Sequence, residues 1–161
     1  HAFQSMEELR PWMHNISVSL REEDNLRIVC GKAASTRLAE TGCMKILAYT
    51  DELSRLRRVR PLIEAFPTVD VVSSGDSNIE IMPTGVSKGS ALEALAVRMG
   101  IEREEIMAFG DHENDHAMLS FAGQSVAMGN ALPAIKEICR YVTETNVQGG
   151  VGKAVQRWAL T

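Results

Sequence analysis

The segment IMAFGDHEND occupies residues 106–115 and decides how we interpret the fold. Its first four residues form a continuous apolar run, which is typical of a β-strand buried on both faces of a parallel sheet. Gly110 then allows a sharp turn off the end of the strand, and residues 113–121 have helical character. A strand that leads through a turn into a helix predicts one unit of an α/β sheet.

The residues on either side of this segment continue the alternation. Ser87 can cap a helix that ends at Gly100, just before the strand. The later elements that we expect are strands at 125–128 and 141–143, a helix at 131–140 behind Asn130 as its cap, and a helix at 151–160. Helices that alternate with strands predict parallel strands joined by right-handed crossovers. Ligands of such sheets bind beyond the carboxyl ends of the strands.

The first half of the chain reads as a mixed α/β region. We expect helices at 6–13, 33–40 and 52–66 and strands at 16–20, 26–30, 44–49, 69–72 and 79–82. Pro61 should kink or break its helix, because proline lacks the backbone donor that a helix interior needs. Residues 73–76, Ser-Ser-Gly-Asp, predict a hairpin turn between the last two strands.

Composition excludes some classes of function. The chain has 161 residues, 45% hydrophobic and 24% charged, with a net charge of −4, which argues against a nucleic-acid surface. The chain has no apolar run of the roughly 20 residues that a membrane span requires. The three cysteines form neither a zinc-binding spacing nor a C-x-x-C pair, which indicates reduced thiols in a cytoplasmic protein.

Two acidic residues follow the strand at 106–109. Asp111 should lie at the carboxyl end of the strand, and Asp115 four residues later in the first turn of the next helix, so both can face one site. Carboxylate oxygens suit Mg²⁺, which usually also keeps waters and substrate phosphate oxygens. Asn114 adds a neutral polar group beside them. The alternative is an acidic helix start that complements the helix dipole.

Lys88 is the fourth candidate. It lies at the start of the helix that precedes the Asp111 strand, so it can return to the same edge of the sheet. A fixed ammonium there can neutralise a transferring phosphoryl group or hold a carboxylate in place. The alternative is a solvated surface lysine.

From about Ile79 to Leu160 the chain resembles the haloacid dehalogenase-like phosphohydrolases, in particular their Cof-type branch. The resemblance rests on a set of short motifs in the family's order: IEIMP (79–83), VSKG (86–89), AFGD (108–111), ND (114–115), ML (118–119), AMGNA (127–131), YVT (141–143) and GGV (149–151).

The resemblance implies the carboxyl-terminal half of a Rossmann-like core at 84–161, with parallel strands, and a partial α/β cap domain at 1–83. It also implies Mg²⁺-dependent hydrolysis of a small phosphate ester, such as a sugar phosphate, through an aspartyl-phosphate. Lys88 would contact the phosphoryl group and the nucleophile, Asp111 would ligate Mg²⁺, Asn114 would touch phosphate or substrate, and Asp115 would brace the metal shell. His112 is at a variable position and receives no role.

The chain departs from the family's pattern at the nucleophile. The family uses two aspartates in a D-x-D motif, and no two of the six aspartates here are two positions apart. Asp51 also follows an apolar strand, but the second position after it is Leu53. We therefore interpret the chain as a C-terminal fragment that is inactive alone and pairs with itself or with an N-terminal half. The alternatives are a phosphomutase of the same superfamily and a non-catalytic α/β binding or regulatory domain.

Overall fold

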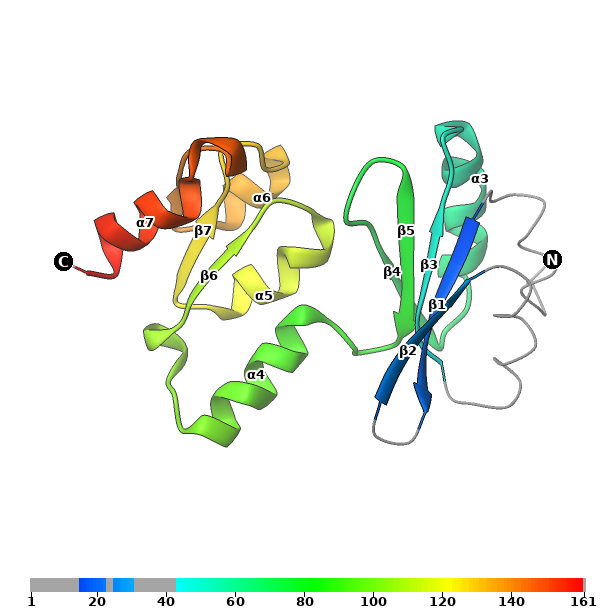
Figure 1. Cartoon of the computed structure of the whole chain (residues 1–161), viewed down its shortest axis with the longest axis horizontal. Coiled ribbons are helices and arrows are strands. Elements are labelled where there is room, and N and C mark those ends of the chain that lie inside the picture. The colour runs from blue at the N-terminus through cyan, green and yellow to red at the C-terminus, as the bar shows by residue number, and fades with distance from the viewer. Residues whose placement is uncertain (1–14, 23–24, 31–42, 161) are drawn as a thin grey trace. The chain divides into compact units, whose positions relative to one another are not determined.

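The computed structural model describes the backbone at residues 15–22, 25–30 and 43–160 (Figure 1), and it describes side chains from Lys45 onward. The helices expected at 6–13 and 33–40 lie outside the described residues. The chain divides into two compact units, His1–Gly85 and Val86–Thr161.

The first unit contains an antiparallel sheet. Its described strands run in the order β2 (Asn25–Cys30), β1 (Asn15–Glu22), β3 (Cys43–Tyr49), β5 (Asn78–Pro83) and β4 (Val69–Val72). All five strands were expected from apolar alternation or short apolar runs, and the turn at 73–76 joins β4 to β5 as an antiparallel pair. The order of the strands could not be predicted, because it depends on pairings between distant segments.

Helix α3 (Leu53–Glu64) contacts β4 and β5 of this sheet. Its residues Leu56, Val59 and Ile63 are buried, as are Ile79 and Ile81 of β5. Pro61 lies inside the helix, which continues to Glu64, so the expected break does not occur. Because buried residues lie on both sides of Pro61, we attribute this continuity to packing that offsets the lost backbone hydrogen bond.

The second unit begins with α4 (Lys88–Met99), which has the expected ends. The Ser87 hydroxyl accepts a hydrogen bond from the Ser90 N–H at 3.0 Å, and the Ser90 hydroxyl accepts one from the Ser87 N–H at 2.9 Å. These bonds satisfy two backbone donors at the start of the helix. Gly100 ends the helix with a φ of 66°, a left-handed conformation that glycine adopts without steric cost.

The sheet of this unit is parallel, as expected. In its described part, β6 (Met107–Gly110) pairs with β7 (Gln124–Ala127), which pairs with β8 (Tyr141–Val142). The remaining elements are the 3₁₀ turns η2 (Arg103–Glu105), η3 (Glu113–Asp115) and η4 (Asn146–Gln148), and the helices α5 (His116–Phe121), α6 (Pro133–Ile138) and α7 (Gly150–Trp158). Small and aliphatic residues form the core between sheet and helices: Ala108, Leu119, Ala122, Ala127, Met128, Ala131 and Ile135.

Three details of this unit differ from expectation. The helix expected at 113–121 is divided into η3 and α5. Helix α6 begins at Pro133 behind Leu132 rather than behind Asn130, because proline is preorganised for a first helical turn and needs no partner for a missing N–H. In β6, Ala108 is buried but Met107 and Phe109 are only half-buried, since among the described strands β6 has a neighbour on one side only.

The structure also bears on membrane spanning and on the state of one cysteine. In the described part of the chain, no helix is long and apolar enough to cross a bilayer. Cys139 is a free, half-buried thiol, and burial raises its pKa.

Candidate functional site

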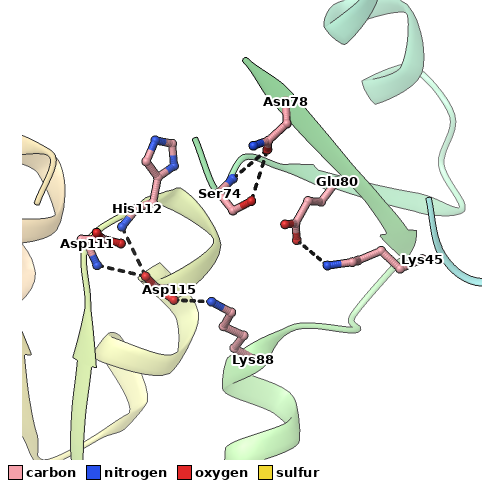
Figure 2. A network of polar contacts seen from close by, with 8 residues as sticks. All are labelled: Lys45, Ser74, Asn78, Glu80, Lys88, Asp111, His112 and Asp115. Carbon is pink, nitrogen blue, oxygen red and sulfur yellow. Dashed lines mark hydrogen bonds and ion pairs between the residues drawn. The ribbon is translucent and has the colours of Figure 1, made fainter. Parts of the chain in front are cut away.

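Asp115 is the centre of a polar network in the second unit (Figure 2). Its side chain is 8% exposed, and its Oδ1 accepts a hydrogen bond from Lys88 Nζ at 2.5 Å. Its Oδ2 accepts bonds from the backbone N–H groups of Asp111 at 2.9 Å and His112 at 3.3 Å. The structure therefore brings Lys88, Asp111 and Asp115 together, as the sequence predicted.

The hydrogen bonds keep Asp115 ionised. Burial alone would raise the pKa of this carboxyl group, because it penalises the charged form. The bond from Lys88 and the two backbone N–H groups outweigh burial and hold the pKa of Asp115 below its usual value. A buried carboxylate with these partners is an anion of fixed orientation.

Gly89 explains how Lys88 reaches Asp115. A Cβ atom at this position would lie 2.6 Å from the backbone carbon of Ala117 and 2.7 Å from its oxygen, closer than van der Waals contact allows. Only glycine lets the first turn of α4 approach α5 this closely, and this approach places Lys88 beside the buried carboxylate. The VSKG motif therefore combines a helix cap, a cation and a packing contact.

Gly110 has a related role. Its φ is not in the left-handed region. A Cβ atom here would instead lie 2.5 Å from Cβ of Asp115 and 2.9 Å from its Oδ2. The sequence suggested that Gly110 permits a sharp turn, whereas the structure shows that glycine leaves the space that the Asp115 side chain occupies.

Asp111 directly follows β6, at the carboxyl end of the strand. Its backbone oxygen accepts a hydrogen bond from the Leu132 N–H at 3.0 Å, and its Oδ2 accepts one from Asn130 Nδ2 at 2.7 Å. Within the described part of the chain, its Oδ1 has no hydrogen-bond partner. This carboxylate therefore has one oxygen fixed and one available to a ligand.

The donor chemistry at Asp111 fits Mg²⁺ without completing its coordination shell. No group of three or more His, Cys, Asp or Glu side chains among the described residues is placed to hold a metal ion. In phosphoryl-transfer sites, however, Mg²⁺ is usually bound through one or two carboxylates together with waters and substrate phosphates. Both oxygens of Asp115 already accept hydrogen bonds, so Asp111 is the better direct ligand, and ligation by Asp115 stays a prediction.

Two further residues, Asn114 and His112, lie next to Asp111 and Asp115 in the sequence. Asn114 is half-buried in η3, and within the described residues its side chain has no hydrogen-bond partner. It is therefore available to a ligand, and its predicted role stays a prediction. His112 contributes its backbone N–H to Asp115.

Asp51 belongs to a different environment. It is exposed and lies in the first unit, between β3 of the antiparallel sheet and α3. The preceding Thr50 is buried, and its hydroxyl accepts a hydrogen bond from the Glu52 N–H at 3.2 Å. Thr50 therefore orders the turn into α3, and the acid beside it has the features of an ordinary loop residue.

Sequence reasoning missed the role of Asn130. We expected this residue to cap α6, but its side chain instead contacts Asp111. A usable signal was present: Asn130 follows β7, the strand next to β6, and the carboxyl ends of adjacent parallel strands meet at one edge of the sheet.

Comparisons with known proteins agree with this architecture. The family model described as haloacid dehalogenase-like hydrolase matches residues 7–155. A Bacillus subtilis protein named 5-amino-6-(5-phospho-D-ribitylamino)uracil phosphatase YcsE is 41% identical over 92 residues, which are 57% of this chain and 37% of that protein. A phosphoglycolate phosphatase of Methanothermobacter thermautotrophicus is 42% identical over 92 residues, covering 52% of this chain and 42% of the relative.

A solved structure, a haloacid dehalogenase-like hydrolase from B. subtilis, has a TM-score of 0.68 and 37% identity. The match covers 72% of this chain and 41% of that structure. The matched regions thus cover less than half the length of these three proteins.

Proposed function

This chain belongs to the haloacid dehalogenase-like hydrolases, and from that premise we propose that it supplies the cation- and phosphate-binding residues of a phosphatase for small phosphate esters. The observation that carries the proposal is the contact between Lys88 and buried Asp115 beside Asp111. A positive and a negative group fixed at the carboxyl edge of a parallel sheet suit a phosphorylated ligand and its counter-ion.

Each residue has a distinct proposed role. Asp111 holds Mg²⁺ through its free oxygen, and Lys88 binds the phosphoryl oxygens and the nucleophile. Asp115 fixes the Lys88 ammonium and the backbone of Asp111 by the bonds described above, and Asn114 contacts phosphate or substrate. When bound, Mg²⁺ neutralises charge that develops on the phosphoryl group. These groups are positioned before substrate arrives, which lowers the cost of reorganisation during the reaction.

The nucleophile must come from elsewhere, because the 161 residues contain no D-x-D pair. An aspartyl-phosphate route needs one carboxylate to attack phosphorus and a second acid to protonate the leaving oxygen. We propose that a segment or chain carrying that pair completes the site and that the isolated chain has little or no turnover. A cytoplasmic location and the assignment of the two units as cap and core also belong to this proposal.

The substrate class follows from the relatives. The two named phosphatases reported above act, by their names, on a phosphorylated ribitylaminouracil and on phosphoglycolate. Both are small molecules with a phosphate ester. We propose a substrate of this class.

A fusion protein tests the proposal. The segment of the B. subtilis relative that precedes the matched region is joined to this chain, and the fusion is assayed with Mg²⁺ and p-nitrophenyl phosphate. We expect turnover in the fusion, none in the isolated chain, and a loss of at least about 100-fold with Lys88→Ala, because a positioned cation contributes several kcal/mol. Arg98→Ala, at the opposite end of α4, is the matched control and should retain activity.

A folded fusion without turnover would contradict the proposal and favour a non-catalytic binding domain. Turnover by the isolated chain that persists with Lys88→Ala would also contradict it. If that turnover disappears with Asp51→Asn, the nucleophile is Asp51.

A further inference from the structure

The side chain of Asn130 connects Asp111 to a turn that follows β8. Its Nδ2 donates a hydrogen bond to Asp111 Oδ2 at 2.7 Å, and its Oδ1 accepts one from the Asn146 N–H at 3.0 Å. Asn146 begins η4. One amide group therefore joins segments that follow all three strands of the parallel sheet, and all of these segments belong to the second unit.

The backbone on either side of Asn130 is built for this connection. A Cβ atom at Gly129 would lie 2.7 Å from the Thr145 nitrogen and 3.0 Å from the Thr143 oxygen. The Gly129 N–H donates to the Glu144 oxygen at 3.1 Å. The segment 143–146 therefore lies directly against residues 129–130, and a larger residue at 129 would separate them.

The turn that receives the amide is itself ordered. Gln148 Oε1 accepts hydrogen bonds from the Thr145 N–H at 3.2 Å and the Thr145 hydroxyl at 2.9 Å. The Asn146 N–H is thus presented by a closed turn, which fixes one end of the Asn130 amide. An amide anchored at its oxygen has its nitrogen directed in one orientation, because the group is planar.

We propose that Asn130 is a positioning residue that fixes the Asp111 carboxylate for a divalent cation. This inference rests on the proposed function, in which Asp111 holds Mg²⁺. The amide occupies Oδ2 and leaves Oδ1 for the cation, so the carboxylate is oriented before the ion binds. Hydrogen bonds that orient metal ligands in this way typically change metal affinity by about 10- to 100-fold.

A purely structural role is a poor explanation for Asn130. The residue is exposed, and it does not cap α6. Exposed hydrogen bonds contribute little to folding stability, because water replaces either partner when the bond is lost. Removal of the amide should therefore alter the Asp111 carboxylate much more than it alters the fold.

The test measures Mg²⁺ affinity of the full 161-residue chain by following the backbone amide resonances of Gly110 and Asp111. We expect Asn130→Ala to weaken binding by about 10- to 100-fold without changing the urea midpoint of the second unit. Asn130→Gln, which keeps the amide on a longer side chain, should restore part of the affinity. Val147→Ala changes an 89% exposed side chain of the same turn and leaves the Asn130 amide and its partners in place, so it is the matched control and should change affinity by less than about 3-fold.

Asp111→Asn separates the two hypotheses. If Asp111→Asn abolishes binding but Asn130→Ala leaves it unchanged, the positioning role of Asn130 is wrong and the metal site stands. If Asp111→Asn leaves binding unchanged, or the parent chain binds no Mg²⁺, both are wrong. A loss of affinity in Asn130→Ala that is matched by an equal loss in Val147→Ala would indicate a structural role only and overturn the inference.

Discussion

Replacement of Asp115 by alanine is the most informative perturbation of the site. It removes three hydrogen bonds to an ionised acceptor, at 2.5, 2.9 and 3.3 Å, from a side chain that is 8% exposed. Bonds to charged groups contribute about 1.5–3 kcal/mol each, but the longest one is weak, and the two residues that donate the backbone bonds are only half-buried. We therefore expect the second unit to lose about 2–4 kcal/mol of unfolding free energy.

Lys88 accounts for a small part of this loss. Its side chain is 49% exposed, and ion pairs with such exposure usually contribute less than about 1 kcal/mol. Lys88→Ala should thus be much milder than Asp115→Ala. The two backbone N–H groups, which close the turn from β6 into η3, account for most of the difference.

The effect should depend on pH. Because the pKa of Asp115 is lowered in the folded chain, the unfolded chain binds a proton more readily, and its carboxyl pKa is about 3.9. The stabilisation is therefore fully present above about pH 4 and is lost as the pH falls through the folded-state pKa. The difference between the parent chain and Asp115→Asn should be largest at pH 7 and shrink below about pH 4.

The assay is urea unfolding followed by the amide resonances of Leu119 and Val126, which are buried in the second unit. His116→Ala, an exposed change at the next position, is the matched control and should stay within about 0.5 kcal/mol of the parent. The reasoning would be refuted if the unfolding free energy of Asp115→Ala at pH 7 lay within about 0.5 kcal/mol of the parent value. A pH-independent loss in Asp115→Asn would refute it as well.

Alanine substitutions at two helical glycines should change stability in opposite directions, and substitution of Lys88 should lower activity much more than stability. Gly89→Ala should destabilise the second unit by about 1–3 kcal/mol, because its Cβ would overlap the Ala117 backbone. Gly152→Ala has open space around it and should stabilise α7 by about 0.5–1 kcal/mol; urea unfolding tests both, and equal shifts would contradict the packing argument. Lys88→Ala should reduce turnover of the fusion protein by orders of magnitude while costing less than about 1 kcal/mol, and unchanged turnover would reduce Lys88 to a surface residue.

The sequence predicted those features that depend on local pattern. Alternating apolar runs and helix caps indicated the parallel sheet of the second unit, and Lys88, Asp111 and Asp115 could be placed together because parallel strands end at one edge. The same rule should have included Asn130, but its position before a helical segment favoured the cap interpretation. That interpretation was wrong because the helix starts at Pro133, three residues after Asn130.

Features that depend on contacts between distant segments were not predictable in this way. The side chain of Asn130 bonds to Asp111, which is 19 positions away in the sequence, and to Asn146, which is 16 positions away. The continuity of α3 through Pro61 depends on packing against a sheet whose strand order the local pattern does not encode. The reason for Gly110 likewise became visible only with the Asp115 side chain in place.

The roles proposed for Asp111 and Asn130 require that a divalent cation binds at Asp111, and paramagnetic broadening by Mn²⁺ tests this requirement. Mn²⁺ is added to the labelled 161-residue chain, and the loss of amide signal is mapped along the sequence. We expect the signals of residues 110–115 to broaden first and that of Asn130 to follow, and we expect Asp111→Asn to remove this pattern. Broadening centred on Asp51 or Asp76, or a pattern unchanged by Asp111→Asn, would contradict it.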